Sequence, residues 1–238
     1  MSTHVMAQHH PAEYQPPHHF PSARAEAEAS KVGMWLFLAT EVLLFAGLFC
    51  AYAAYKTLYP EIFKGAHKLL DLKWGAVNTM VLIFSSLTMA LAVRAAQLGQ
   101  RLNTVKFLAI TWLCGAAFMG VKYIEYSHKI HVGLVPGQYY DMLGFTREFL
   151  EKFPQTPMSE VERLARGAHL FYGVYFLMTG LHGLHVLIGM GAIGWVLVRA
   201  MRGAFSPKFY FPVELVGLYW HLVDLIWIYL FPLLYLVG

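Results

Sequence analysis

The amino-acid sequence predicts an all-α integral membrane protein, a bundle of five transmembrane helices. Three observations predict this fold class. Apolar residues make up 58% of the 238 residues and charged residues 13%, against roughly 45–50% and about 25% in soluble proteins. Five stretches reach the length of about 20 mostly apolar residues that a helix needs to cross a bilayer. The short alternating segments of a membrane β-barrel are absent, and helices satisfy their own backbone hydrogen bonds in lipid.

The chain divides into a polar tail and a membrane domain. Residues 1–30 are rich in His, Pro and Ala, a composition that favours a disordered tail. No apolar stretch typical of a cleavable signal peptide precedes Ser30, so we expect the first spanning helix to direct insertion. Residues 31–238 are expected to form the five-helix domain. The net charge of +4 comes without a dense run of Lys or Arg, which argues against nucleic acid as a partner.

Each predicted helix corresponds to one apolar stretch. In order, these stretches are Gly33–Tyr55, Trp74–Ala96, Thr104–Tyr126, Ala168–Val198 and Pro212–Leu236. The first is interrupted only by Glu41, the second is uncharged as far as Val93, and the fourth contains no Asp, Glu, Lys or Arg. Within the long connection Ser127–Gly167, Ser159 and Glu162 have the spacing of a capping box. This spacing leaves open that the fourth helix begins outside the bilayer.

Glu41 is an isolated acid near the middle of the first helix. It lies about 12 Å from Gly33 along the axis, at 1.5 Å per residue. An ionisable side chain inside a membrane is costly and is a functional candidate by default. Glu41 is interpreted either as a carboxyl that handles or tunes a proton, or as a protonated acid bonded to a neighbouring helix or subunit.

The last helix carries Glu214, His221 and Asp224. His221 and Asp224 are three residues apart and share a face, and Glu214, seven residues before His221, falls on the same stripe. An acid beside a histidine at mid-membrane is typical of a proton relay. The alternative is a polar pair whose members hydrogen-bond to each other and lock the helix packing.

His182 and His185 in the fourth helix have the i, i+3 spacing of a metal-binding pair. No Cys or carboxylate accompanies them there, and haem ligation would need a second histidine helix, such as the one with His221. On the nearly opposite face lies a glycine stripe, formed by Gly173, Gly180, Gly191 and Gly194. Small residues let membrane helices approach closely. The structural alternative is that the glycines face one helix while the histidines hydrogen-bond to another.

Polar groups of the second and third helices are interpreted as packing groups. Asn78, Ser85 and Ser86 bring amide and hydroxyl groups that bond across helices or to their own carbonyls. Lys122 and Lys129 flank Glu125 at i, i+3 and i+4 spacing, which predicts a ladder of ion pairs. Neither a phosphate-binding glycine loop nor a nucleophile–base pair is found, so the residues indicate no complete catalytic site.

Several motifs occur in order along these helices. Residues 219–227 read YWHLVDLIW and lead to FPLLY at 231–235, and residues 180–189 read GLHGLHVLIG. GMWLF at 33–37 leads to Glu41 and Phe45, Asn78-Thr79 precedes Ser85-Ser86-x-Thr88, and Glu125-Tyr126 closes the third helix. Over Val32–Val237 the chain resembles subunit III of the haem–copper cytochrome c oxidases, in the five-helix form of bacteria.

The resemblance implies a non-catalytic core subunit of an aa3- or caa3-type oxidase. Such a subunit supports the catalytic subunit, holds structural phospholipid and sustains proton uptake during oxygen reduction in aerobic respiration. The chain is then expected to bind no haem, copper or other metal, because these belong to partner subunits I and II. Subunit II receives electrons from cytochrome c or carries a fused cytochrome c. Proton-tuning or structural roles are expected for Glu41, His182, His185, Glu214, His221 and Asp224.

The resemblance also implies a place in the bacterial plasma membrane, with a cytoplasmic N-terminus and a periplasmic or exterior C-terminus. The Lys and Arg residues outside the spans favour the same orientation once Ser127–Gly167 is left out, because the positive-inside rule discounts long loops. Many family members have two further N-terminal helices that form a lipid cleft with the rest. A cleft of that kind is expected here only if a partner subunit supplies its other wall.

Three alternatives stay open. Subunit III of a quinol oxidase, or the related accessory protein of nitric oxide reductase, would share these motifs, because the electron donor binds on another subunit. A membrane cytochrome b would use the buried histidines as haem ligands and would be coloured in isolation. A proton carrier built around Glu41 and Asp224 would transport without partners.

Overall fold

The computed structural model describes residues 21–237, and these fold into five long helices and several short ones. The long helices are α1 (Ala23–Leu58), α3 (Leu72–Gln97), α4 (Arg101–Val132), α6 (Met158–Met201) and α7 (Phe211–Phe231), which Pro232–Leu236 (η3) extends. Each is long and apolar enough to cross a membrane. No strand occurs in the described residues, so the predicted all-α membrane bundle is confirmed.

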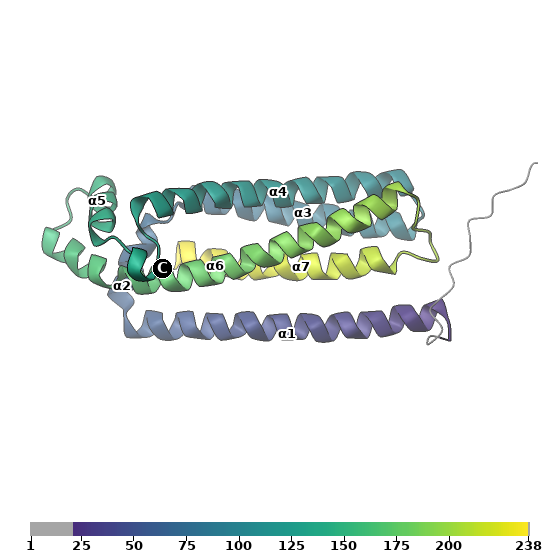
Figure 1. Cartoon of the computed structure of the whole chain (residues 1–238), viewed down its shortest axis with the longest axis horizontal. Helices are drawn as coiled ribbons and strands as arrows, with labels where there is room; N and C mark the ends of the chain where they lie inside the picture. Colours follow the sequence, from purple (N-terminus) through teal and green to yellow (C-terminus); the bar gives the residue numbers. More distant parts are fainter. Residues whose placement is uncertain (1–20, 238) are drawn as a thin grey trace, which may run out of the picture.

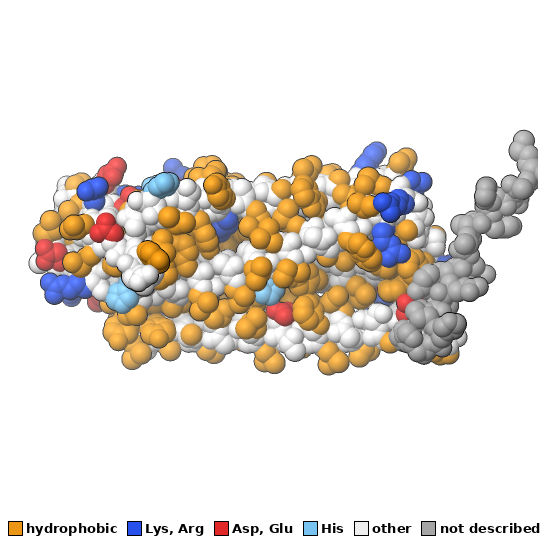
Figure 2. Space-filling model, viewed as in Figure 1, with side chains coloured by type: hydrophobic (Ala, Val, Ile, Leu, Met, Phe, Trp, Pro, Cys, Tyr) orange, Lys and Arg blue, Asp and Glu red, His pale blue; other side chains and the backbone are white. Residues whose placement is uncertain are grey.

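The bundle is layered around α6 and α7. α1 lies along one side, α3 and α4 pair on the opposite side, and α6 crosses between them with α7 (Figure 1). The short helices α2 (Pro60–Ala66), η1 (His67–Leu69), η2 (Gly137–Tyr139) and α5 (Met142–Lys152) gather at one end, beside the end of α7. Charged side chains collect at the two ends of the molecule, and its long middle surface is mostly hydrophobic (Figure 2). This distribution is what a spanning protein requires, because water reaches only the ends.

Two helices begin earlier than the apolar stretches predict. α1 begins at Ala23 because the Ser22 side chain caps it, accepting a hydrogen bond from the Ala25 backbone N–H. Residues 23–30 are therefore helical and not part of a disordered tail, while residues 1–20 lie outside the described residues. α6 begins at Met158 after Pro157 and continues unbroken past Gly167. The predicted capping box does not cap it, since Ser159 lies inside the helix.

The connections at the α5 end are tied to α6. α4 ends at Gly133, whose φ of +79° ends the helix in the left-handed conformation that favours glycine. The Tyr140 hydroxyl then donates to the Ala165 carbonyl of α6 at 2.7 Å. Burial raises the pKa of Tyr140 above its ordinary value, so this hydroxyl keeps its proton as a donor.

α1 touches the bundle along a narrow stripe. Its buried residues among those described are Leu38, Phe45 and Tyr52, which recur every seven residues. Neighbouring side chains such as Leu36, Leu43 and Leu44 are exposed. A large apolar surface of α1 therefore faces lipid or a partner, and few contacts decide where α1 sits.

Candidate functional site

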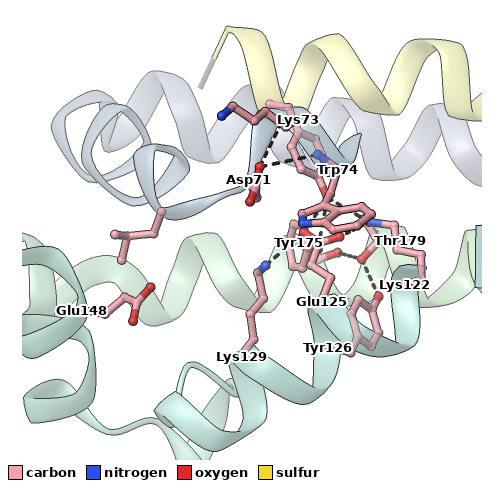
Figure 3. A network of polar contacts seen from close by, with 12 residues as sticks. Asp71, Lys73, Trp74, Lys122, Glu125, Tyr126, Lys129, Glu148, Tyr175 and Thr179 are labelled. Atoms are coloured by element: carbon pink, nitrogen blue, oxygen red, sulfur yellow. Dashed lines mark hydrogen bonds and ion pairs between the residues drawn. The ribbon is translucent and has the colours of Figure 1, made fainter. Parts of the chain in front are cut away.

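An ionic cluster is formed by Lys122, Glu125, Lys129, Tyr175 and Tyr235. The ammonium groups of Lys122 and Lys129 lie 2.8 Å and 3.0 Å from the two carboxylate oxygens of Glu125. All three charged side chains are at most 7% exposed. The predicted ladder of ion pairs is thus confirmed, and Figure 3 shows it reaching from α4 toward α6.

Tyrosines from two other helices complete the ionic cluster. The hydroxyls of Tyr175 and Tyr235 donate to Glu125 Oε1 at 2.8 Å and 2.7 Å, and Lys122 Nζ donates to the Tyr235 hydroxyl. The ring of Trp227 lies 4.6 Å from Lys122 Nζ. Two ammonium groups and one carboxylate leave a buried net charge of +1. The Trp227 ring stabilises this charge, because the face of an aromatic ring attracts cations. The tyrosines lie 50 and 110 residues from Glu125, so no local sequence pattern predicts them.

Glu41 of α1 pairs with His185 of α6. The Glu41 Oε2 and His185 Nε2 atoms are 2.7 Å apart, and His185 Nδ1 lies 2.7 Å from the Leu181 carbonyl oxygen. A carbonyl only accepts, so Nδ1 carries a hydrogen and Nε2 shares one proton with Glu41. Either Glu41 is neutral, or a carboxylate faces an imidazolium. Both states are neutral overall, which lowers the cost of an acid at this depth.

Polar contacts also hold the two ends of α1. At one end Lys31 Nζ lies 2.8 Å from Glu214 Oε1, at the start of α7. At the other end the Tyr52 hydroxyl donates to the Leu233 carbonyl at 2.8 Å. Glu214 therefore contacts α1 rather than acting together with His221. Together with the Glu41–His185 pair, these contacts attach the exposed helix α1 to the bundle at three depths. Lipid chains offer no hydrogen-bond partners that could replace them.

The remaining acid and histidine of α7 bond to serines of α3. His221 Nδ1 lies 2.7 Å from Ser86 Oγ, and Asp224 Oδ2 accepts a long bond of 3.4 Å from Ser85 Oγ. Trp220 Nε1 donates to the same Ser85 oxygen at 3.0 Å. The expected direct bond between His221 and Asp224 is not formed. Side chains at i and i+3 lie about 5–6 Å apart, and each group reaches the facing helix instead.

Replacing Ser85 by Ala should destabilise the α3–α7 contact. The substitution leaves the buried Trp220 N–H without an acceptor, so we expect a loss of about 1–3 kcal/mol in the free energy of unfolding. Ser86→Ala removes a half-buried hydroxyl from the next position and should cost less. Thermal unfolding of the purified protein in detergent checks this order. Equal stability of the two variants would mean that Trp220 finds another acceptor.

Two residues with predicted structural roles have no hydrogen-bond partner among the described residues. His182 and Asn78 are buried, and neither has a hydrogen-bond partner for its polar side-chain atoms among residues 21–237.

The glycine stripe predicted on α6 does not make a close contact with another helix. A Cβ at Gly173 or Gly180 would meet its nearest neighbour only at 3.8 Å, and Gly191 is exposed with nothing within 4 Å of such a Cβ. These three glycines therefore pack closely against no other helix of the described chain.

The close approach to α7 is made instead by Gly189. A Cβ at this position of α6 would lie 2.8 Å from the Trp220 ring. The glycine periodicity did not single out Gly189, because the facing Trp220 belongs to another helix. Among the described residues no three His, Cys, Asp or Glu side chains form a group that could hold a metal ion.

Comparison with known proteins agrees with this architecture. The cytochrome c oxidase subunit III family matches residues 13–145 and 163–238. The chain is 32% identical to cytochrome c oxidase subunit 3 of Synechocystis sp., over 86% of this chain and 74% of that protein. It is 30% identical to probable cytochrome c oxidase subunit 3 of Nocardia farcinica, over 87% of both. It is 28% identical to cytochrome bo(3) ubiquinol oxidase subunit 3 of Pseudomonas putida, over 87% and 85%. The resemblance seen in the motifs is confirmed: this chain belongs to the cytochrome c oxidase subunit III family, the third subunits of haem–copper terminal oxidases.

Proposed function

We propose that this chain is the non-catalytic subunit III of a bacterial cytochrome c oxidase of the aa3 or caa3 type. It associates in the plasma membrane with subunit I, which holds haem and copper, and with subunit II, which takes electrons from cytochrome c. Its role is to support the catalytic subunit, to hold structural phospholipid and to sustain proton uptake. Its N-terminus faces the cytoplasm, and its α5 end faces the periplasm or exterior.

The observation that carries this proposal is the hydrogen bonding of His185 and His221 inside the bundle. Both ring nitrogens of His185 are engaged, by Glu41 and by the Leu181 carbonyl, and His221 Nδ1 is engaged by Ser86. A histidine that ligates haem needs a free nitrogen directed at the iron. The engagement of His185 therefore favours a helix-joining role for this residue and leaves the His182–His185 motif without a second haem ligand.

The surface of α1 supports the proposed association with other subunits and lipid. A groove of about 620 Å³ between α1 and α7 is lined by Trp35, Leu38, Ala39, Val42, Leu43, Leu218, His221, Leu222 and Leu225. Its walls are apolar except at His221. An acyl chain fits such a surface, and so does an apolar side chain from a partner helix.

A quinol oxidase is the second candidate. The Pseudomonas putida relative, a ubiquinol oxidase subunit, matches this chain at 28% identity with coverage similar to that of the cytochrome c oxidase subunits. The 32% and 30% identities to cytochrome c oxidase subunits favour cytochrome c as the electron donor.

The test is purification of the complex through a tag on this chain in mild detergent. Subunit mass spectrometry, an absorption spectrum and oxygen uptake are then measured with reduced cytochrome c and, separately, with a quinol. We expect haem a and copper in the partner subunits, a colourless chain once it is stripped off, and turnover with cytochrome c. Turnover with quinol alone would establish the second candidate. A haem spectrum on the stripped chain would overturn the accessory role.

A further inference from the structure

His182 is a fully buried histidine that the protein itself does not satisfy. Its side chain is 0% exposed, and neither ring nitrogen has a hydrogen-bond partner among residues 21–237. A neutral imidazole presents one donor and one acceptor, and leaving a buried polar group unpaired costs about 1–3 kcal/mol. Buried polar groups that lack protein partners are typically paired with ordered water.

The Trp227 indole lies against His182 and against a second group with an unused hydrogen-bond donor, Lys122. The His182 ring stacks on the Trp227 ring with centroids 5.1 Å apart, and Lys122 Nζ lies 4.6 Å from the centroid of that ring. Lys122 has three N–H groups, of which Glu125 and Tyr235 take two. Asn78, whose amide nitrogen and oxygen are both unpaired, adjoins Thr79, the acceptor of the Trp227 N–H. Three polar groups, from His182 on α6, Lys122 on α4 and Thr79 on α3, thus contact the indole of Trp227 on α7.

We propose that bound water molecules at His182 and Asn78 connect the ionic cluster to the Glu41–His185 pair and allow Glu41 to exchange its proton with the aqueous phase at the α5 end. The row Tyr175, Thr179, His182 and His185 runs along one face of α6 at spacings of four, three and three residues. Side chains at such spacings lie about 5–6 Å apart. One water with two hydrogen bonds of about 2.8 Å spans that gap.

The two ends of this route are already in place. At the outer end, Tyr175 bonds to Glu125, and Thr179 lies 2.5 Å from the Tyr126 hydroxyl. Glu125 and Lys129 line a cavity of about 440 Å³, together with Leu69, Asp71, Trp74, Val121, Ile124, His128, Glu148, Glu151 and Lys152. Figure 3 shows Asp71 and Glu148 near this cluster. At the inner end, the Glu41–His185 pair holds the single shared proton.

The exchange moves no net charge. Each deuteron that reaches Glu41 from heavy water replaces one proton, which leaves along the same waters to the solvent. The buried +1 charge of the ionic cluster opposes a free hydronium ion on this route, so we infer exchange rather than sustained proton current.

Isotope exchange in the assembled complex tests the route. The purified complex is mixed rapidly with heavy water. The infrared bands of the pair, identified as those lost in Glu41→Gln, are followed in time. We expect the bands of the wild-type complex to exchange completely. His182→Phe should slow the exchange by about tenfold or more, since a hydrogen-bonded bridge is lost.

Tyr172→Phe is the matched control. Tyr172 is also buried on α6 with an unpaired polar atom, but it lies outside the segment between Glu125 and Glu41. This variant should exchange at the wild-type rate. An unchanged rate in His182→Phe would overturn the proposal.

A density map that resolves ordered water decides the matter if His182→Phe does not assemble. Water within hydrogen-bonding distance of His182 and Asn78 in the wild-type complex supports the proposal, and a dry interior there overturns it. Asn78→Leu gives a second variant, in which exchange should also be slower.

Discussion

Glu125→Gln should be the most destabilising substitution in this chain. The carboxylate is paired with two buried ammonium groups, and it accepts bonds from Tyr175 and Tyr235 as well. Gln keeps the size of the side chain but removes the negative charge to which both lysines are hydrogen-bonded. Breaking a buried ion pair from one side costs about 3–5 kcal/mol. We expect a loss of that order in thermal unfolding, and loss of the subunit from the purified complex.

Glu28→Gln provides the matched control. Glu28 lies 2.8 Å from Arg24 on α1, and the two side chains are 65% and 89% exposed. Exposed pairs of this kind contribute about 0–1 kcal/mol, so the same chemical change should have little effect. Replacing Lys122, Glu125 and Lys129 together by apolar residues should recover stability relative to Glu125→Gln, because no uncompensated charge remains. Equal stability of Glu125→Gln and Glu28→Gln would show that water screens the cluster.

Glu41→Leu should loosen α1 from the bundle, whereas Glu41→Gln should not. Leu leaves His185 Nε2 without a partner and removes the mid-membrane bond between α1 and α6. We expect a loss of about 1.5–3 kcal/mol, the range for a hydrogen bond to a charged group. The amide of Gln can still donate to His185. Glu41→Gln should therefore assemble normally, with a modest fall in oxidase activity over many turnovers.

A double-mutant cycle with His185→Leu isolates this interaction. The double variant should be no less stable than Glu41→Leu alone, because the partner left unpaired is removed as well. Simple addition of the two losses would mean that the residues are not coupled. Complete loss of activity in an assembled, haem-loaded Glu41→Gln complex would make Glu41 essential to the chemistry, against the accessory role.

The helix ends illustrate where prediction from composition stops. The apolar stretch begins at Gly33, yet Ser22 caps α1 and extends it by more than two turns through alternating Ala and Glu. α6 likewise continues from the bilayer region back to Met158. Hydropathy marks the part of a helix that lies in lipid, whereas caps and tertiary contacts decide where the helix ends.

Charges close in sequence were easier to predict than pairs between helices. The Lys122–Glu125–Lys129 ladder follows from i, i+3 and i+4 spacing, because one helix sets those distances. Glu41 and His185 are 144 residues apart, and no pattern in either helix identifies the other. His221 and Asp224 share a face as predicted, but their bonds go to Ser86 and Ser85, which only the packing of α7 on α3 could reveal.

The sequence by itself determined that this is a five-helix membrane protein of the subunit III family, and which polar residues lie inside the spans. These features depend on composition, length and local spacing. Only the tertiary structure decided which polar residues meet: Glu41 with His185, Glu214 with Lys31, and Glu125 with two distant tyrosines. The physical reason is that lipid provides no hydrogen-bond partners, so each buried group depends on the neighbouring helix that packing places beside it.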